Sequence, residues 1–102
     1  MMEEIQLKLN EHSRGTFFIE DGGKRIAEMD IGIDAPNITV FHTGVEPEFE
    51  GRGIAKKLLT NLVQYAREHN LKVIALCKYV FVQFSRHPDE YQDVWNKNWK
   101  EE

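Results

Sequence analysis

The chain has 102 residues, 41% of them hydrophobic and 29% charged, a balance typical of one folded domain with a modest core. Its net charge of −4 argues against nucleic-acid binding through a broad basic surface. No stretch approaches the roughly 18 apolar residues that cross a bilayer, and the acidic start Met1-Met2-Glu3-Glu4 lacks the order of a secretion signal. A single cysteine excludes an internal disulfide. We therefore expect one domain over residues 1–102, a cytoplasmic monomer with no membrane or nucleic-acid partner.

The N-terminal third predicts antiparallel strands joined by tight turns. Ile5–Leu9 alternates apolar and polar side chains, the period-two pattern of a half-buried strand. Residues 16–20 and 25–29 flank Asp21-Gly22-Gly23-Lys24, and its Asp-Gly and Gly-Gly steps supply the positive φ that tight hairpin turns require. These residues predict a β-meander.

The middle of the chain predicts a strand–helix–strand unit. After Ala35-Pro36-Asn37, residues 38–45 are rich in β-branched and aromatic side chains and too apolar for an exposed edge, so they predict a central strand. Residues 54–69 change to a helical period, and residues 71–77 form the next strand. Such a unit makes its two strands parallel and its crossover right-handed. The apolar face of the expected helix carries Ile54, Leu58, Leu59, Leu62, Val63 and Ala66.

A second helix is expected at about residues 80–85, ended by His87-Pro88. The tail from Asp89 to Glu102 contains Trp95 and Trp99. Its pattern fits either a short helix that docks on the domain or a frayed end from about residue 95.

The loop of residues 46–55 joins the central strand to the first helix and contains Gly51 and Gly53. These glycines let backbone N–H groups turn towards an anion without a Cβ in the way, and the helix N-terminus adds its dipole. Arg52 and Lys56 could add positive charge to a phosphate or pyrophosphate site. The alternative is an ordinary tight turn between strand and helix. A Walker loop is excluded because no Gly-Lys-Ser/Thr follows, and a Rossmann fingerprint lacks its third glycine.

Cys77 and His42 are the candidate reactive side chains. Cys77 ends a strand and precedes a helix, whose dipole would stabilise its thiolate; the alternative is a buried structural cysteine. His42 interrupts an apolar strand, and if the two strands are parallel neighbours both residues lie near their carboxyl ends, where open sheets place ligands. His42 could accept a proton from the thiol or from an amine, or be a hydrogen-bonded core residue. Tyr79 is close enough in sequence to line a pocket with Cys77.

Other polar residues carry weaker signals. Glu46, Glu48 and Glu50 form an acidic run that is either a solvated loop or a means of recruiting a cationic amine. No group of His, Cys, Asp and Glu has the spacing of metal ligands, so we expect no metal.

Several of these segments together resemble a known family. His42-Thr43-Gly44-Val45 followed by Gly51-Arg52-Gly53-Ile54-Ala55 is similar to the acetyl-coenzyme A-binding motif of the GNAT N-acetyltransferases, Arg/Gln-x-x-Gly-x-Gly/Ala. The first motif position is Glu48 here, a departure from the usual Arg or Gln. Cys77-Lys78-Tyr79-Val80 and Pro88-Asp89-Glu90-Tyr91 extend the similarity to the minimal, roughly hundred-residue branch, over residues 12 to 95.

The resemblance implies an α+β, GNAT-like mixed sheet: an antiparallel meander, then a βαβ unit whose parallel strands splay apart around the cofactor. It implies acetyl-coenzyme A or coenzyme A as cofactor, an unidentified amine or protein acceptor, and an open acceptor side. It casts Cys77 as nucleophile or acid and His42 as its assistant. The alternatives are a coenzyme A-binding sensor without turnover and a small interaction domain. The residues expected to contact the cofactor are Thr43, Gly44, Val45, Glu50, Gly51, Arg52, Gly53, Ile54, Ala55, Lys56 and Tyr79.

Overall fold

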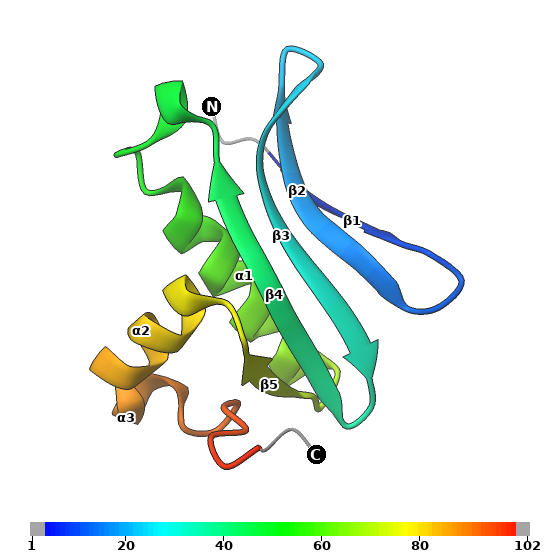
Figure 1. The fold of residues 1–102 in the computed structure, drawn as a ribbon, viewed down its shortest axis with the longest axis vertical. Coiled ribbons are helices and arrows are strands. Elements are labelled where there is room, and N and C mark those ends of the chain that lie inside the picture. Colours follow the sequence, from blue (N-terminus) through cyan, green and yellow to red (C-terminus); the bar gives the residue numbers. More distant parts are fainter. Residues whose placement is uncertain (1–3, 100–102) are drawn as a thin grey trace.

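A computed structural model describes residues 4–99 and shows a five-stranded mixed sheet with its helices gathered on one side (Figure 1). The strands lie in chain order across the sheet. None of the described helices is long and apolar enough to cross a membrane. The elements are β1 (Ile5–Leu9), β2 (Arg14–Asp21), β3 (Lys24–Asp34), β4 (Asn37–Val45), the 3₁₀ turn η1 (Pro47–Phe49), α1 (Ile54–Glu68), β5 (Lys72–Ala75), α2 (Lys78–Arg86) and α3 (Pro88–Tyr91).

Strands β1 to β4 form the predicted antiparallel meander. The β2–β3 hairpin turns at Gly22 and Gly23, whose φ angles of 61° and 83° lie in the left-handed region that glycine adopts most readily. Strands β2 and β3 are longer than predicted because the ladder between them runs from Arg14 opposite Gly32 to Asp21 opposite Lys24; β2 gains residues 14, 15 and 21, and β3 gains residues 24 and 30–34. A cis peptide bond joins Ala35 to Pro36 in the β3–β4 turn.

Helix α1 covers the inner face of the sheet with the six apolar residues that the helical period predicts, all of them buried. It ends in a Schellman motif. Asn70 has a φ of 56°, and the Leu71 N–H donates to the Ala66 carbonyl at 2.8 Å. Because Leu71 completes this helix end, β5 begins one residue later than predicted.

Parallel pairing between β4 and β5 is short. It runs from Asn37 opposite Lys72 to Val40 opposite Ala75 and then stops. The N–H groups of Leu76 and Cys77 both reach the Val40 carbonyl, at 3.1 and 2.9 Å, and α2 begins directly afterwards. The predicted strand over residues 71–77 is therefore four residues long, and the two strands diverge beyond Val40. The expected mixed sheet with a splayed parallel pair is confirmed.

The C-terminal segment packs against the domain as far as it is described. Helix α2 is longer than predicted, and the four-residue α3 follows it. Val94 is 2% exposed, and Trp95 bridges to Val73 of β5. The Arg67 Nε of α1 donates a hydrogen bond to the Asp93 carboxylate at 2.8 Å. The tail is therefore docked through residue 95; the last part of the predicted frayed end, residues 100–102, lies outside the described residues.

Candidate functional site

A cleft of about 350 Å³ opens between the end of β4 and the start of α1. It brings together all the residues expected to contact a cofactor except Arg52. Its lining is Thr43, Gly44, Val45, Phe49, Glu50, Gly51, Gly53, Ile54, Ala55, Lys56 and Tyr79.

Gly51 and Gly53 give the cleft its open floor. Their φ angles are 81° and 75°, and Gly53 is the N-cap residue of α1. A Cβ built on either residue would meet no heavy atom within 4 Å, so the space beside both glycines is open. The left-handed backbone and the open space fit a group that approaches the main chain closely.

The backbone N–H groups of residues 51–56 donate no hydrogen bond to any part of residues 4–99. The first helical bond of α1 runs from the Lys57 N–H to the Gly53 carbonyl at 3.1 Å. No side chain caps this helix end. A run of free amides at a helix N-terminus favours an anion through both hydrogen bonding and the helix dipole. Phosphate oxygens fit this donor set.

Glu48, which departs from the family motif, turns away from the cleft. Lys24 at the start of β3 lies 3.5 Å from its carboxylate, and Glu48 is not among the lining residues. The departure therefore does not place the Glu48 carboxylate in the cleft, although Glu50 lines it. Arg52 also lies outside the lining, and its guanidinium sits 5.0 Å from the centre of the Phe49 ring. Phe49 was not predicted to line the cleft; a lone aromatic residue in a charged loop is the signal for it.

The free edge of β4 extends the cleft along the sheet. Glu46 donates its N–H to the Ile26 carbonyl of β3 at 2.8 Å. Because backbone groups alternate between the two sides of an antiparallel strand, those of Thr43 and Val45 face away from β3, towards the gap where β5 has ended. They are available to an extended ligand.

Cys77 lies at the inner end of this gap as the N-cap residue of α2. It is 6% exposed and does not line the cleft. Its thiol donates to the Thr43 hydroxyl at 3.3 Å. The structure therefore brings Cys77 together with Thr43.

Tyr79 lines the cleft from the first turn of α2. Burial raises the pKa of its phenol, and the neighbouring Cys77 adds to the increase. Tyr79 therefore keeps its proton at neutral pH and can donate a hydrogen bond into the cleft.

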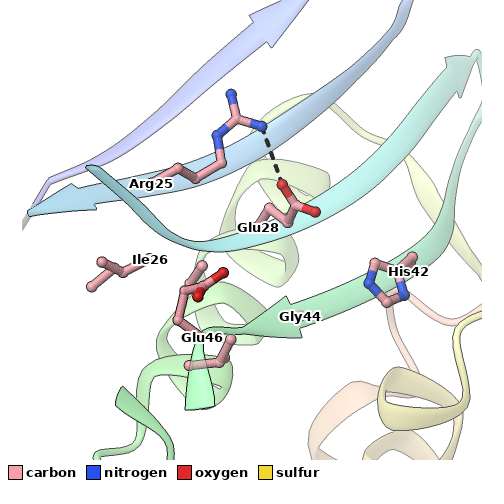
Figure 2. Close-up of a pocket in the computed structure, with 8 residues that line it drawn as sticks. Arg25, Ile26, Glu28, His42, Gly44 and Glu46 are labelled. Atoms are coloured by element: carbon pink, nitrogen blue, oxygen red, sulfur yellow. Dashed lines mark hydrogen bonds and ion pairs between the residues drawn. The ribbon is translucent and has the colours of Figure 1, made fainter. Parts of the chain in front are cut away.

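His42 lies on the opposite, outer face of β4. A β-bulge at Phe41 leaves that residue without a partner, since Val40 pairs with Ile31 and His42 with Asp30. Because Thr43 faces Cys77 on the inner side, its neighbour His42 points outward, where it is exposed. This exposure excludes a core histidine. His42 lines a second pocket of about 410 Å³ with Arg25, Glu28, Gly44 and Glu46 (Figure 2).

Among residues 4–99 no group of three or more His, Cys, Asp or Glu side chains is arranged to hold a metal ion.

Comparison with known proteins gives three results. A family model described as GCN5-related N-acetyl-transferase matches residues 16–94. The solution structure of a GCN5-like protein from Staphylococcus aureus is 38% identical, with a TM-score of 0.67, over 92% of this chain and 90% of that one. A search of curated protein sequences finds no match.

More distant structures share the fold. The ribosomal-protein-S18-alanine N-acetyltransferase of Escherichia coli is 18% identical, with a TM-score of 0.59, and the match covers 65% of this chain and 43% of the Escherichia coli chain. A ribosomal-protein-alanine N-acetyltransferase from Brucella melitensis is 18% identical, with a TM-score of 0.61, over 91% of this chain and 72% of the Brucella chain. With the family model covering most of its length, the chain belongs to the GCN5-related N-acetyltransferase family.

Proposed function

We propose that this chain binds acetyl-coenzyme A in the cleft at the end of β4 and transfers the acetyl group to an amine. The observation that carries the proposal is the run of free N–H groups over residues 51–56, which includes Gly51 and Gly53 with open space beside them. These groups would hold the pyrophosphate. Lys56 would add charge to the same site.

The free edge of β4 would hold the pantetheine arm. The backbone groups of Thr43 and Val45 face the gap and would bond to the amides of the arm. Acetyl-coenzyme A supplies an activated thioester. Tyr79 would donate a proton to the departing sulfur, because its phenol is protonated at neutral pH.

Two routes are open for Cys77. As a nucleophile it would accept the acetyl group and pass it to the amine, whereas in direct transfer it would only position Thr43 through their hydrogen bond. Its burial and its place outside the lining favour direct transfer. His42 would accept the proton of the amine from the outer face of the strand.

The second candidate function is a coenzyme A sensor without turnover. The burial of Cys77 and its place outside the lining also support this function. A binding module needs the free N–H groups of residues 51–56, here called the cradle, but no reactive thiol beside the thioester. In either case we propose a monomer that does not bind nucleic acid.

The test pairs calorimetric titration of acetyl-coenzyme A with intact mass spectra, followed by an assay with small amines, peptide lysines and peptide N-termini. Binding with transfer to an amine supports the enzyme. An added acetyl group that maps to Cys77 and is lost in Cys77→Ala supports the covalent route. Binding without transfer to any acceptor supports the sensor, and absence of binding contradicts both.

A further inference from the structure

Thr43 is a cleft residue whose side chain keeps one unused hydrogen. Its hydroxyl oxygen accepts a hydrogen bond from the Cys77 thiol at 3.3 Å, and its own hydrogen has no acceptor among residues 4–99. A hydroxyl has one hydrogen and two lone pairs, so a donor on one lone pair leaves the hydrogen for another partner. Thr43 lines the cleft and Cys77 does not. The hydrogen is therefore available to a group bound in the cleft.

Thr43 also marks the end of the cleft that lies farthest from the cradle along β4. The strand lines the cleft with residues 43–45, of which Val45 is next to the glycine loop. Thr43 lies two residues, about 7 Å, further along the strand. The edge of β4 is occupied again at Val40, whose carbonyl accepts the Cys77 N–H at 2.9 Å. A ligand with its phosphates on the cradle would therefore place its thioester near Thr43.

The surroundings of Thr43 favour negative charge. Cys77 is the N-cap residue of α2, and no side chain caps this end of the helix. The first N–H that bonds within the helix is that of Phe81, which donates to the Cys77 carbonyl at 3.0 Å. The N-terminus of α2 therefore adds the positive end of its dipole beside Thr43.

We propose that Thr43 is a catalytic residue that stabilises the oxyanion of acetyl transfer, an inference that rests on the proposed function. Its hydroxyl donates a hydrogen bond to the thioester carbonyl oxygen. When the amine nitrogen bonds to the acetyl carbon, an electron pair moves onto this oxygen and the hydrogen bond strengthens. The pair returns as the carbon–sulfur bond breaks; the nitrogen loses one proton and the departing sulfur gains one. Thr43 keeps its own proton throughout.

Cys77 serves this reaction as a positioning residue. Its thiol holds the Thr43 oxygen, so that the hydroxyl hydrogen points away from Cys77 and towards the cleft. The buried thiol therefore contributes to direct transfer without touching the thioester.

The test is isotope-edited infrared spectroscopy of bound acetyl-coenzyme A labelled with ¹³C at the thioester carbon. A hydrogen bond to a carbonyl oxygen lowers its stretching frequency. Thr43→Val keeps the shape of the side chain and removes the hydroxyl, so its bound ligand should absorb at a higher frequency than the ligand bound to the wild type. Thr43→Ser keeps the hydroxyl and should retain most of the wild-type shift. Cys77→Ala frees the hydroxyl to rotate and should broaden the band.

Thr39→Val is the matched control for the spectrum. It makes the same change on the same strand, but Thr39 pairs with Ile74 of β5 and does not line the cleft. The band should stay at its wild-type frequency in this variant. Urea denaturation verifies that each variant is folded.

A rate measurement then tests catalysis. Hydroxylamine is a small amine that needs no dedicated acceptor site, and it cleaves the thioester of bound acetyl-coenzyme A. The cleavage should be about tenfold or more slower in Thr43→Val than in the wild type, because the charge on the carbonyl oxygen loses a donor. Thr39→Val should react at the wild-type rate.

The outcomes separate this inference from the proposed function. An unchanged band in Thr43→Val, or an equal change in Thr39→Val, would overturn the contact between Thr43 and the thioester and leave the cofactor cleft standing. Equal hydroxylamine rates in Thr43→Val and the wild type would overturn the catalytic role. An unchanged band in Cys77→Ala would overturn the positioning role of the thiol. Absence of acetyl-coenzyme A binding in calorimetry would overturn the proposed function itself.

Discussion

Strand β4 has two halves that meet different neighbours. From Asn37 to Val40 it pairs with β3 on one side and β5 on the other, and Ile38 and Val40 are 0% exposed. From His42 to Val45 only β3 pairs with it, and the other edge opens onto the cleft. The bulge at Phe41 marks the boundary.

The difference separates stability from binding within one strand. The closed half pairs with a strand on each side and buries Ile38 and Val40 in the core. The open half leaves the backbone groups of Thr43 and Val45 without a strand partner on one side. Changes in the closed half should therefore alter folding, and changes around the open half should alter ligand binding.

The largest expected effect is on the closed half. Ile38→Ala should lower the free energy of unfolding by about 3 kcal/mol, because it leaves a cavity in the core. Val45→Ala, in the half-buried open half, should cost about 1 kcal/mol. Urea denaturation of both variants measures the difference. Equal losses would show that the two halves of β4 contribute alike to stability.

A matched pair of glycines tests the open half. Gly53→Ala and Gly22→Ala both place a Cβ at positive φ in open space and should each cost about 1 kcal/mol of stability. Only Gly53 lines the cleft, so only Gly53→Ala should weaken coenzyme A binding, by about tenfold or 1.4 kcal/mol. Calorimetry gives both affinities. A similar loss in Gly22→Ala would mean that the effect is not local to the cleft.

Cys77 lies beside the point where the two halves of β4 meet, since its N–H reaches the Val40 carbonyl. Removing its side chain should therefore separate an effect on folding from an effect on binding. Cys77→Ala loses a buried sulfur and the hydrogen bond to Thr43, which should cost about 1 kcal/mol of stability. Coenzyme A affinity should stay within about twofold of the wild-type value, since Cys77 does not line the cleft. Thermal unfolding and calorimetry check the two parts. A large loss of affinity would place the thiol in the binding site.

The smallest expected effect concerns the C-terminal segment, residues 88–95. It contacts β5, which pairs with the closed half of β4. Arg67 donates a hydrogen bond to Asp93 and holds the pKa of this carboxyl below its ordinary value of 3.8. The stabilisation is therefore complete above that value and is lost as pH falls through the lowered pKa. Asp93→Ala should cost less than about 1 kcal/mol at neutral pH, because the pair is exposed.

Denaturation curves at several pH values test this dependence. Wild type and Asp93→Ala should converge in stability as the pH falls below 3.8 and Asp93 takes up its proton. Arg67→Ala should show a similar loss at neutral pH. A stability difference that persists in acid would assign the effect of Asp93 to packing.

Much of the fold follows from local patterns. The alternation in β1, the glycines of the β2–β3 turn and the apolar face of α1 each determine their element without distant contacts. Gly51 and Gly53 likewise predict the loop between β4 and α1, because the positive φ angles of this loop are ones that glycine adopts readily. Sequence therefore predicts the backbone conformation of this loop well, and its role in binding phosphate stays a prediction.

The relation of His42 to Cys77 could not be predicted in the same way. Strict alternation from Ile38 and Val40 would turn His42 inward, but the bulge at Phe41 shifts the phase by one residue and turns Thr43 inward instead. A bulge depends on the partner strand, which a local pattern does not contain. The docking of the C-terminal segment could not be predicted for the same reason. It depends on contacts with Arg67 and Val73, which lie far away in sequence.

The most direct test of the central claim is calorimetric titration with coenzyme A and with pantetheine, which lacks the pyrophosphate and the adenosine 3′-phosphate attached to it, in the wild type and in Gly53→Ala. If the free amides of residues 51–56 hold that group, coenzyme A should bind at least about tenfold more tightly than pantetheine. Gly53→Ala should remove most of this advantage. Equal affinities for the two ligands, or an advantage that Gly53→Ala leaves intact, would contradict the cradle.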